Sequence, residues 1–157
     1  MSKNFLLILF IATLLFSCTD SKKKEQPKNK GRVLDYTNEL IFISEKGETV
    51  STLTFIKADT PNERNQGLMD VNSMPKDAGM VFYFDTEEPQ SFWMMNTPLP
   101  LDIMYVNADS VIVSIYKSAV PFSDKNLPSG APAKYVIETN AGYSISNDIK
   151  EGMRVRF

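Results

Sequence analysis

Two carboxylates set in apolar surroundings are the residues of this sequence whose type and position could do chemistry. Asp102 lies in "PLPLDIMYV" and Glu138 lies in "KYVIETN". Burial disfavours the charged form of a carboxyl group, so its pKa rises unless a cation or hydrogen-bond donors compensate, and acid–base catalysts are built in this way. Asp102 and Glu138 are therefore candidate catalytic residues. The structural alternative is an internal network in which they pair with Arg64 or cap backbone N–H groups.

The residue types that the sequence lacks exclude several reactions. The chain has no histidine, and its single cysteine is Cys18. Ser-His-Asp and Cys-His catalysis and histidine-ligated zinc are therefore excluded. The sequence also has no glycine-rich phosphate loop and no GxSxG motif. The enzymatic alternative that remains is a carboxylate-based hydrolase acting on envelope glycans through Asp102 and Glu138.

Methionine is the other frequent residue with chemical potential. Residues 33–157 contain seven methionines, and thioether sulfur is a soft ligand that selects Cu(I). Met69, Met80 and Met94 are the candidate ligands of a second alternative, a Cu(I)-binding periplasmic protein. Methionine also fills irregular cores and contacts aromatic rings favourably. Because Met94 and Met95 would point to opposite faces of a strand, packing is favoured, and no cofactor or metal is predicted.

The stretch "QSFWMMNTPLPLDIMYVN", residues 90–107, joins aromatic and sulfur side chains to a short polar segment. We interpret it as a mostly packed surface with a polar seam at Asn96, Thr97 and Asp102. Trp93 would share a face with Met95 and would suit a sugar or an apolar ligand. The candidate ligand-binding residues are Arg64, Trp93, Asn96, Thr97, Asp102 and Glu138.

The N-terminal residues are predicted to lie outside the folded domain. Residues 1–17 combine Lys3 with an apolar run that has the length of a signal-peptide core and is too short to span a bilayer. The run ends in "LLFSC", which resembles the lipobox of bacterial lipoproteins, where cleavage precedes a cysteine that becomes lipidated. Cys18 is then the lipidation site and anchors the chain through several acyl chains. The alternative is an ordinary secretory signal with Cys18 as a chance thiol.

Charge separates the remaining chain into a tether and a domain. Residues 18–32 hold the cysteine and a lysine-rich segment without apolar periodicity, which predicts a flexible tether. Residues 33–157 form a single domain with ten Lys and Arg residues against seventeen Asp and Glu residues. This acidic balance excludes nucleic acid as a partner.

These features predict a lipid-anchored binding or interaction module of the cell envelope, with an unknown small-molecule, glycan or protein ligand. Thr19 follows the cysteine, and by resemblance to Gram-negative sorting signals this favours the outer membrane, with the domain facing the periplasm. The membrane itself, contacted through lipidated Cys18, is the expected partner.

The elements that must position the candidate residues are mostly strands. "LIFIS" and "VSTLTFI" flank a turn centred on Gly47 and predict a hairpin. Further strands are predicted at "GMVFYF", "SFWMM", "LDIMYVN", "VIVSIY", "YVIET" and "GMRVRF". Thr60 begins a capping box with Glu63 ahead of a helix to about Met69. A second short helix is predicted near 141–149, and "PFSDKNLPSGAPA" is predicted to be a long exposed loop.

The predicted fold class is α+β. The domain is β-rich, with a bent antiparallel or mixed sheet, barrel-like or sandwiched because several strands are apolar on both faces, and with two short helices.

Four motifs in this order, "ERNQGLM", "GMVFYF", "FWMMNTPLPLDIMYVN" and "VIETNAGYSISNDIKEGMRVRF", resemble DUF family 192 (domain of unknown function) over about residues 48–157. The resemblance implies a compact β-rich α+β domain, often secreted or membrane-anchored in bacteria, and it implies no reaction. Two departures are visible: Met95 stands where the family usually carries lysine, and Asp70 where a basic or aromatic residue is common. The residues that match the motif core are Arg64, Gly67, Leu68, Met69, Gly79, Met80, Phe92, Trp93, Met94, Asn96, Thr97, Pro100, Leu101, Asp102, Glu138 and Gly142.

Overall fold

The computed structural model describes residues 31–157. The predicted signal peptide (1–17), Cys18 and all of the predicted tether except its last two residues lie outside the described residues. Between residues 31 and 157, no helix is long and apolar enough to cross a lipid bilayer. The elements of this part of the chain are, in order, β1 (Asn38–Ile43), β2 (Thr49–Ala58), α1 (Pro61–Gln66), β3 (Ala78–Phe92), β4 (Leu101–Val106), β5 (Ile112–Ala119), β6 (Leu127–Asn140), α2 (Tyr143–Ser146) and β7 (Arg154–Arg156).

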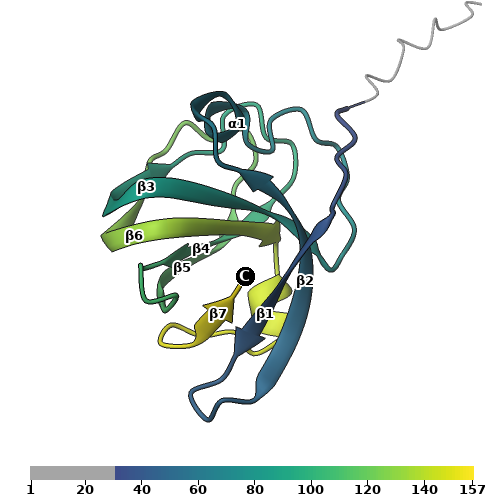
Figure 1. Ribbon diagram of the computed structural model, residues 1–157. Helices are drawn as coiled ribbons and strands as arrows, with labels where there is room; N and C mark the ends of the chain where they lie inside the picture. Colours follow the sequence, from purple (N-terminus) through teal and green to yellow (C-terminus); the bar gives the residue numbers. More distant parts are fainter. Residues whose placement is uncertain (1–30) are drawn as a thin grey trace, which may run out of the picture.

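The strands form one seven-stranded sheet in the order β5-β4-β6-β3-β2-β1-β7, which curls into a half-barrel (Figure 1). The sheet is mixed, because β2 and β3 are parallel while the other neighbours are antiparallel. α1 lies in the crossover between the two parallel strands, where such a pair needs a long connection. The β-rich, bent, mixed sheet with two short helices is thus confirmed, although the helices hold only six and four residues.

The two edges of the sheet meet at one point. Val111, just before β5, forms an isolated antiparallel bridge with Arg154 of β7. The N–H of Ile112 donates to the carbonyl of Met153 (2.9 Å), and the N–H of Val155 donates to the carbonyl of Ser110 (2.8 Å). These bonds satisfy backbone groups that an open edge would leave unpaired.

Both faces of the central strands are buried, and β4 buries all six of its residues. One apolar cluster includes Phe42, Met104 and Ile137 and extends to α2 and β7. The other includes Phe82 and Ile103 and extends to the segment after α1 and to the β3–β4 loop. Burial on both faces explains why these strands read as continuous apolar runs without alternation.

The separate strand predicted at "SFWMM" is wrong beyond its first two residues, Ser91 and Phe92, which end β3. β3 runs without a break from Ala78 to Phe92, and Trp93 to Asn96 form a loop. Within this loop the N–H of Met94 donates to the carbonyl of Ser123 (2.9 Å), and Asn96 has a φ of 53°. A left-handed residue of this kind ends regular pairing, and asparagine tolerates it better than most residues.

The predicted long loop at "PFSDKNLPSGAPA" is also wrong over most of its length, because β6 begins at Leu127. Its first half pairs with β3 alone, through Ser91↔Pro128 and Pro89↔Pro132, and β4 joins only from Tyr135 onward. This half of β6 is therefore a sheet edge, where proline is tolerated because its missing N–H removes no ladder bond.

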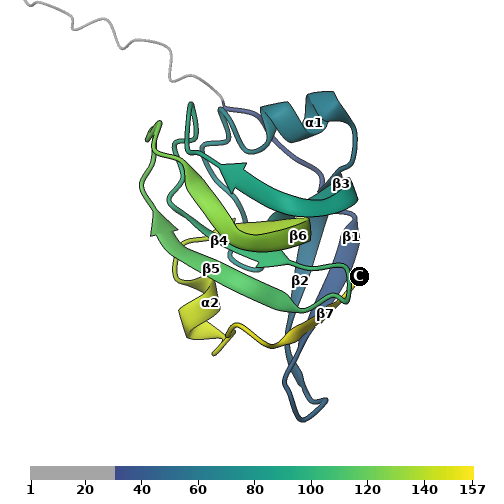
Figure 2. The same ribbon diagram turned by 90° about the vertical axis from the view of Figure 1, so that its left-hand side faces the viewer.

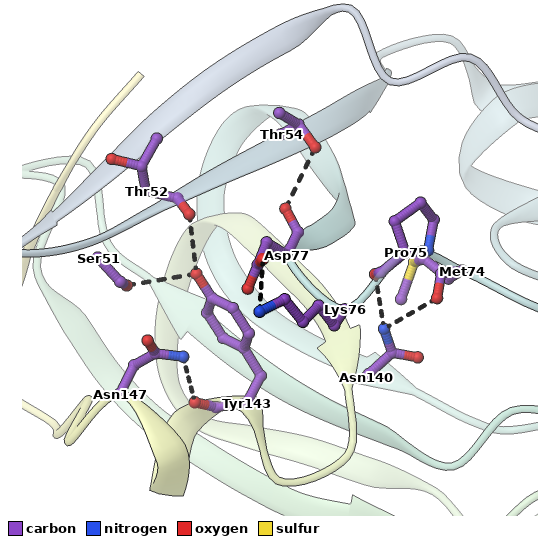
Figure 3. A network of polar contacts seen from close by, with 10 residues as sticks. All are labelled: Ser51, Thr52, Thr54, Met74, Pro75, Lys76, Asp77, Asn140, Tyr143 and Asn147. Atoms are coloured by element: carbon purple, nitrogen blue, oxygen red, sulfur yellow. Dashed lines mark hydrogen bonds and ion pairs between the residues drawn. The ribbon is translucent and has the colours of Figure 1, made fainter.

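Local hydrogen bonds fix both helices. The capping box is confirmed: the Glu63 N–H donates to Thr60 Oγ1 (3.3 Å), and the Thr60 N–H donates to Glu63 Oε2 (2.9 Å). α1 ends before the predicted Met69 because Gly67 follows it with a φ of 45°. α2 is tied to β2 by the Tyr143 hydroxyl, which donates to the Thr52 carbonyl (3.2 Å; Figure 3).

Candidate functional site

A cavity of about 630 Å³ lies beside α1. α1 and the turn after it, the second half of β3, the β3–β4 loop and one residue of β6 form its lining. This volume lies within the range of pockets that bind small molecules. The lining is mainly apolar, and its larger apolar side chains are Leu68, Met69, Phe82, Phe84, Phe92, Trp93 and Met95. The polar residues among it include Arg64, Gln90, Thr97 and Glu138.

Glu138 is the acidic residue of the cavity lining. It lies in the middle of the sheet, in register with Met80 on β3 and with Ile103 on β4. Its side chain is almost fully buried, and this burial raises the pKa of its carboxyl group from 4.5 to about 8. Its Oε2 atom has no hydrogen-bond partner, and none of the ion pairs within residues 31–157 involves it. Glu138 is thus a buried acid without a compensating cation.

Gln90 supplies a second unsatisfied group to the same cavity. Its Nε2 atom is buried and has no hydrogen-bond partner within the described chain. The backbone N–H of Gln90 donates to Ser129 Oγ (3.0 Å), next to an irregularity in the β3–β6 register between Pro89 and Ser91. Gln90 was not a sequence candidate. The signal that could have indicated it is Pro89, because a proline inside a strand pattern often marks an edge or a bulge.

Arg64 joins α1 to β3 on the wall of the cavity. Its Nη1 atom donates to the carbonyl of Tyr83 (2.8 Å) and to that of Asp59. The guanidinium carbon lies 5.3 Å from the centre of the Phe84 ring, a cation–π geometry. Within residues 31–157, Arg64 forms no ion pair with either candidate carboxylate.

Asp102 is fully buried and belongs to a hydrogen-bond network on the other face of the sheet. Its Oδ1 accepts from the N–H of Ser118 (2.9 Å), and its Oδ2 accepts from the N–H (2.9 Å) and the hydroxyl (2.7 Å) of Ser144. Its partner in register on β6 is Thr139, the neighbour of Glu138. Because successive side chains on a strand point to opposite faces, Asp102 and Glu138 do not converge. Asp102 therefore occupies the internal network of the structural alternative.

The β3–β4 loop divides its candidates between the cavity and the surface. Trp93 and Thr97 line the cavity, and the Thr97 hydroxyl donates to the Met95 carbonyl (3.2 Å). Asn96 is exposed and does not line it. The structure thus brings together four of the six candidate ligand-binding residues, namely Arg64, Trp93, Thr97 and Glu138.

The three methionines of the Cu(I) alternative lie in different surroundings. Met80 and Met94 are buried in an apolar cluster and do not line the cavity, whereas Met69 does. Met95, which was not among the proposed ligands, also lines it. Among residues 31–157, no three His, Cys, Asp or Glu side chains gather as they would around a metal ion.

Comparison with solved structures finds close likenesses. A crystal structure from Sinorhizobium meliloti 1021, described as that of a suggested transcription regulator, is 36% identical, with a TM-score of 0.74, over 80% of this chain and 97% of that one. A protein of unknown function from Novosphingobium aromaticivorans DSM 12444 is 30% identical, with a TM-score of 0.72, over 76% of this chain and 84% of that one. No curated protein matches significantly.

A family model described as "Uncharacterized ACR", which carries the name DUF192, matches residues 41–157. The match includes every residue of the cavity lining and the strands that position it. Because the match covers well over half of the sequence, this chain belongs to the DUF192 family.

Proposed function

We propose that this chain is a lipid-anchored binding protein of the cell envelope, whose cavity holds a small molecule with an apolar body and at least one hydrogen-bonding group. The observation that supports the proposal is the unpaired Glu138 carboxyl in a cavity lined by aromatic rings and methionines. A buried polar group without a partner costs about 1–3 kcal/mol. A ligand that hydrogen-bonds to Glu138 would recover this cost on binding.

Two polar groups of the cavity, Glu138 and Gln90, favour a neutral ligand, because the Arg64 guanidinium is already engaged by two backbone carbonyls and the Phe84 ring. With a pKa of about 8, Glu138 is mostly protonated at pH 7, and a protonated carboxyl donates one hydrogen bond and accepts others. The Gln90 amide offers N–H donors to the same cavity. Trp93, which is 46% exposed, provides a ring on which a sugar or an apolar group can pack. A hydroxylated or amide-bearing compound, including a sugar, matches this combination.

Location at the envelope is the second part of the proposal. It is supported by the apolar run and the "LLFSC" motif of the N-terminal sequence and by the polar segment after Cys18. We propose that Cys18 is lipidated and that the domain faces the periplasm from the outer membrane. Mass spectrometry of the mature protein tests this, because an acylated N-terminal Cys18 is expected, and an unprocessed N-terminus would contradict it.

Regulation by direct DNA contact is not part of the proposal. The S. meliloti relative is described as a suggested transcription regulator, but the domain of this chain carries ten basic against seventeen acidic residues. Nucleic-acid binding depends on cationic side chains that neutralise phosphates. We therefore expect no binding of this chain to nucleic acid.

The two alternative functions are not favoured. Carboxylates that hydrolyse a glycosidic bond flank it at about 5–10 Å from each other, whereas Asp102 and Glu138 lie on opposite faces of the sheet. A Cu(I) site would need converging thioethers, and two of the three proposed ligands, Met80 and Met94, are packed in the core.

Fluorescence titration tests ligand binding directly, because Trp93 is the only tryptophan of the sequence and lines the cavity. The probes are neutral monosaccharides, N-acetylated sugars, aliphatic alcohols and aliphatic amides. We expect one class to change the Trp93 emission saturably. Glu138→Gln should weaken that binding about tenfold, which corresponds to the loss of one hydrogen bond of about 1.4 kcal/mol.

The matched control is Asp148→Asn, which makes the same acid-to-amide change at an exposed residue of the α2–β7 connection. Asp148 has a φ of 52°, which asparagine tolerates, and its ion pair with Lys150 is exposed and therefore weak. We expect wild-type affinity in this variant. The proposed function would be contradicted if none of the four probe classes changed the Trp93 emission or gave a heat of binding in calorimetry, and if the protein also turned over a substrate.

A further inference from the structure

Exposed apolar side chains occur on two loops beside the cavity. Trp93 in the β3–β4 loop is 46% exposed, and Val120 and Phe122 in the β5–β6 loop are 68% and 64% exposed. The loops are hydrogen-bonded to each other, since the N–H of Met94 donates to the carbonyl of Ser123 (2.9 Å) and the N–H of Phe122 donates to the carbonyl of Thr97 (3.1 Å). We call residues 93–100 and 120–126 together the apolar loop face. Three exposed large apolar side chains on two hydrogen-bonded loops make this face a candidate interaction surface.

The N-terminal segment joins the domain beside this face. The N–H of Arg32 donates to the carbonyl of Asp70 (2.8 Å), and the N–H of Asp70 donates in turn to the carbonyl of Asn96 in the β3–β4 loop (2.9 Å). The Arg32 guanidinium also donates to the carbonyls of Gly67 and Met69 (both 2.9 Å). Figure 2 shows the start of the described chain, α1 and the β5–β6 loop at one end of the molecule, with α2 toward the other.

Charge distinguishes the apolar loop face from the rest of the domain. Residues 89–101 contain no charged side chain, and residues 120–126 contain one acidic and one basic residue, Asp124 and Lys125. The domain as a whole is acidic, with ten basic against seventeen acidic residues, so its net charge would be repelled by anionic lipid headgroups. The apolar loop face has almost no charge and would not be repelled by these headgroups. The five lysines of residues 19–30 would be attracted to them.

The length of the N-terminal segment permits contact with a bilayer. Thirteen residues lead from Cys18 to Gly31, and at about 3.3–3.6 Å per residue they span at most about 45 Å. The described chain enters the domain beside the apolar loop face, so an anchor at Cys18 would leave this face within reach of the bilayer.

We propose that the apolar loop face docks on the lipid bilayer that carries the anchor, with Trp93, Val120 and Phe122 in the interfacial region. Tryptophan suits this position because its ring is amphipathic. Trp93 also lines the cavity, so the cavity would open at the membrane surface and take its ligand there. This inference rests on the lipid anchor of the proposed function and adds an orientation to it.

The sole tryptophan is a built-in probe of the docked state. The mature lipoprotein is incorporated into phosphatidylethanolamine–phosphatidylglycerol vesicles, with and without lipids brominated on the acyl chains. We expect Trp93 to emit at a shorter wavelength than a tryptophan exposed to water, and iodide should not quench it. We also expect the brominated lipids to quench the Trp93 emission. The double variant Val120→Ser, Phe122→Ser should stay on the vesicles and lose most of this quenching.

A matched control moves the probe to the other end of the molecule. Ile145 on α2 is 65% exposed, and Ile145→Trp combined with Trp93→Phe should give emission that iodide quenches and brominated lipids do not. Equal quenching by brominated lipids at both positions would overturn the orientation.

Vesicle flotation separates the two proposals. Protein that floats while Trp93 remains accessible to iodide would overturn docking and leave the anchor intact. Protein that does not float would overturn both. A shift of Trp93 emission that disappears as the lipid-to-protein ratio rises would assign the face to a second copy of the chain and would also overturn docking on lipid.

Discussion

At the scale of single residues, the two candidate carboxylates differ in their hydrogen bonds. Asp102 accepts three hydrogen bonds, from Ser118 and Ser144. Glu138 lies one register position away on the neighbouring strand, and its Oε2 atom accepts none. Both lie in similar apolar sequence patterns, so the pattern indicates burial for each. Which face each side chain occupies, and hence which one reaches a cavity, depends on the β4–β6 register.

The Glu138 carboxyl should make stability fall with rising pH. Its pKa is 4.5 in an unfolded chain and about 8 in the folded protein. The folded state therefore keeps a proton that the unfolded state releases, so this group favours folding fully below pH 4.5 and loses its contribution as pH rises toward 8. The loss is at most about 5 kcal/mol, because each pKa unit corresponds to about 1.4 kcal/mol.

Urea denaturation at pH 5.5 and pH 8.5 measures this effect. Without histidine in the sequence, no side chain of ordinary pKa titrates in most of this window. Glu138→Gln should abolish most of the decrease and should be more stable than wild type at pH 8.5. An equal decrease in both proteins would show that Glu138 ionises normally.

Asp102→Ala should destabilise the protein without affecting the cavity. The substitution leaves the N–H groups of Ser118 and Ser144 and the Ser144 hydroxyl without their acceptor. The two Ser144 donors are buried, and each costs about 1–3 kcal/mol when it is left unsatisfied. Ser118 is exposed, so its N–H can donate to water instead. We therefore expect a loss of roughly 2–5 kcal/mol in the free energy of unfolding. The measurement is chemical denaturation, accompanied by the Trp93 titration below the unfolding transition. A variant of wild-type stability that has lost ligand affinity would instead place Asp102 in the binding site.

At the scale of elements, the close approach of β3 and β6 positions Glu138. A Cβ atom on Gly79 would lie 2.4 Å from the backbone oxygen of Glu138 and 3.0 Å from a methyl group of Leu53. Gly79→Ala must therefore separate the two strands at the residue that carries the acid, and we expect a cost of about 3 kcal/mol, as for other overpacked positions. Denaturation gives the cost, and the Trp93 titration should show weaker ligand binding.

Gly130→Ala is the control for the Gly79 variant. Gly130 lies on β6 with a φ of 70° and has nothing within 4 Å of an added Cβ atom. The substitution should therefore cost only backbone strain of about 1–2 kcal/mol and leave ligand affinity unchanged. If both alanine variants behaved alike, the contact between Gly79 and Glu138 would not control the site.

Elements defined by local signals could be predicted from the sequence. The residue types of Thr60 and Glu63 themselves indicate the α1 capping box. The glycine at position 47, where φ is 83°, indicates the turn of the β1–β2 hairpin. The start of β6 could not be predicted, because Pro128 and Pro132 are compatible with a strand only where one side of it is unpaired. That condition is set by tertiary pairing.

The candidate site was predictable to the extent that its residues carry a signal of their own. Glu138 is an acidic residue within an apolar strand pattern, and Trp93 is an aromatic residue just before the polar pair Asn96 and Thr97. Trp93 and Met95 both line the cavity while Met94 is buried, which is the alternation predicted from a strand. The alternation arises in a loop with a turn at residues 95–96 and not in a strand. Gln90 carries no such signal, because its position depends on an irregularity between β3 and β6.

At the scale of the whole molecule, β7 holds the half-barrel together and should control its stability. It pairs with β1 over three residues and bridges to Val111 at the other edge. Val155 is buried in the apolar cluster, and the Phe157 ring lies 4.8 Å from Tyr135 and 5.6 Å from Tyr83. Deleting residues 154–157 should remove at least about 3 kcal/mol from the free energy of unfolding, because burial of a Val side chain contributes about 1.5–3 kcal/mol and strand hydrogen bonds are lost as well.

Hydrogen exchange should locate that loss at the two edges of the sheet. Amides of β1 and β5 should lose protection in the truncated chain, while those of β3 and β6, which are paired on both sides near Glu138, should keep more of it. Phe157→Ala retains β7 and removes only aromatic contacts of a 39% exposed residue, so it should cost about 1 kcal/mol. A truncated chain as stable as the Phe157→Ala variant would mean that the edges are held without β7, and that the curl around Glu138 is a property of the central strands alone.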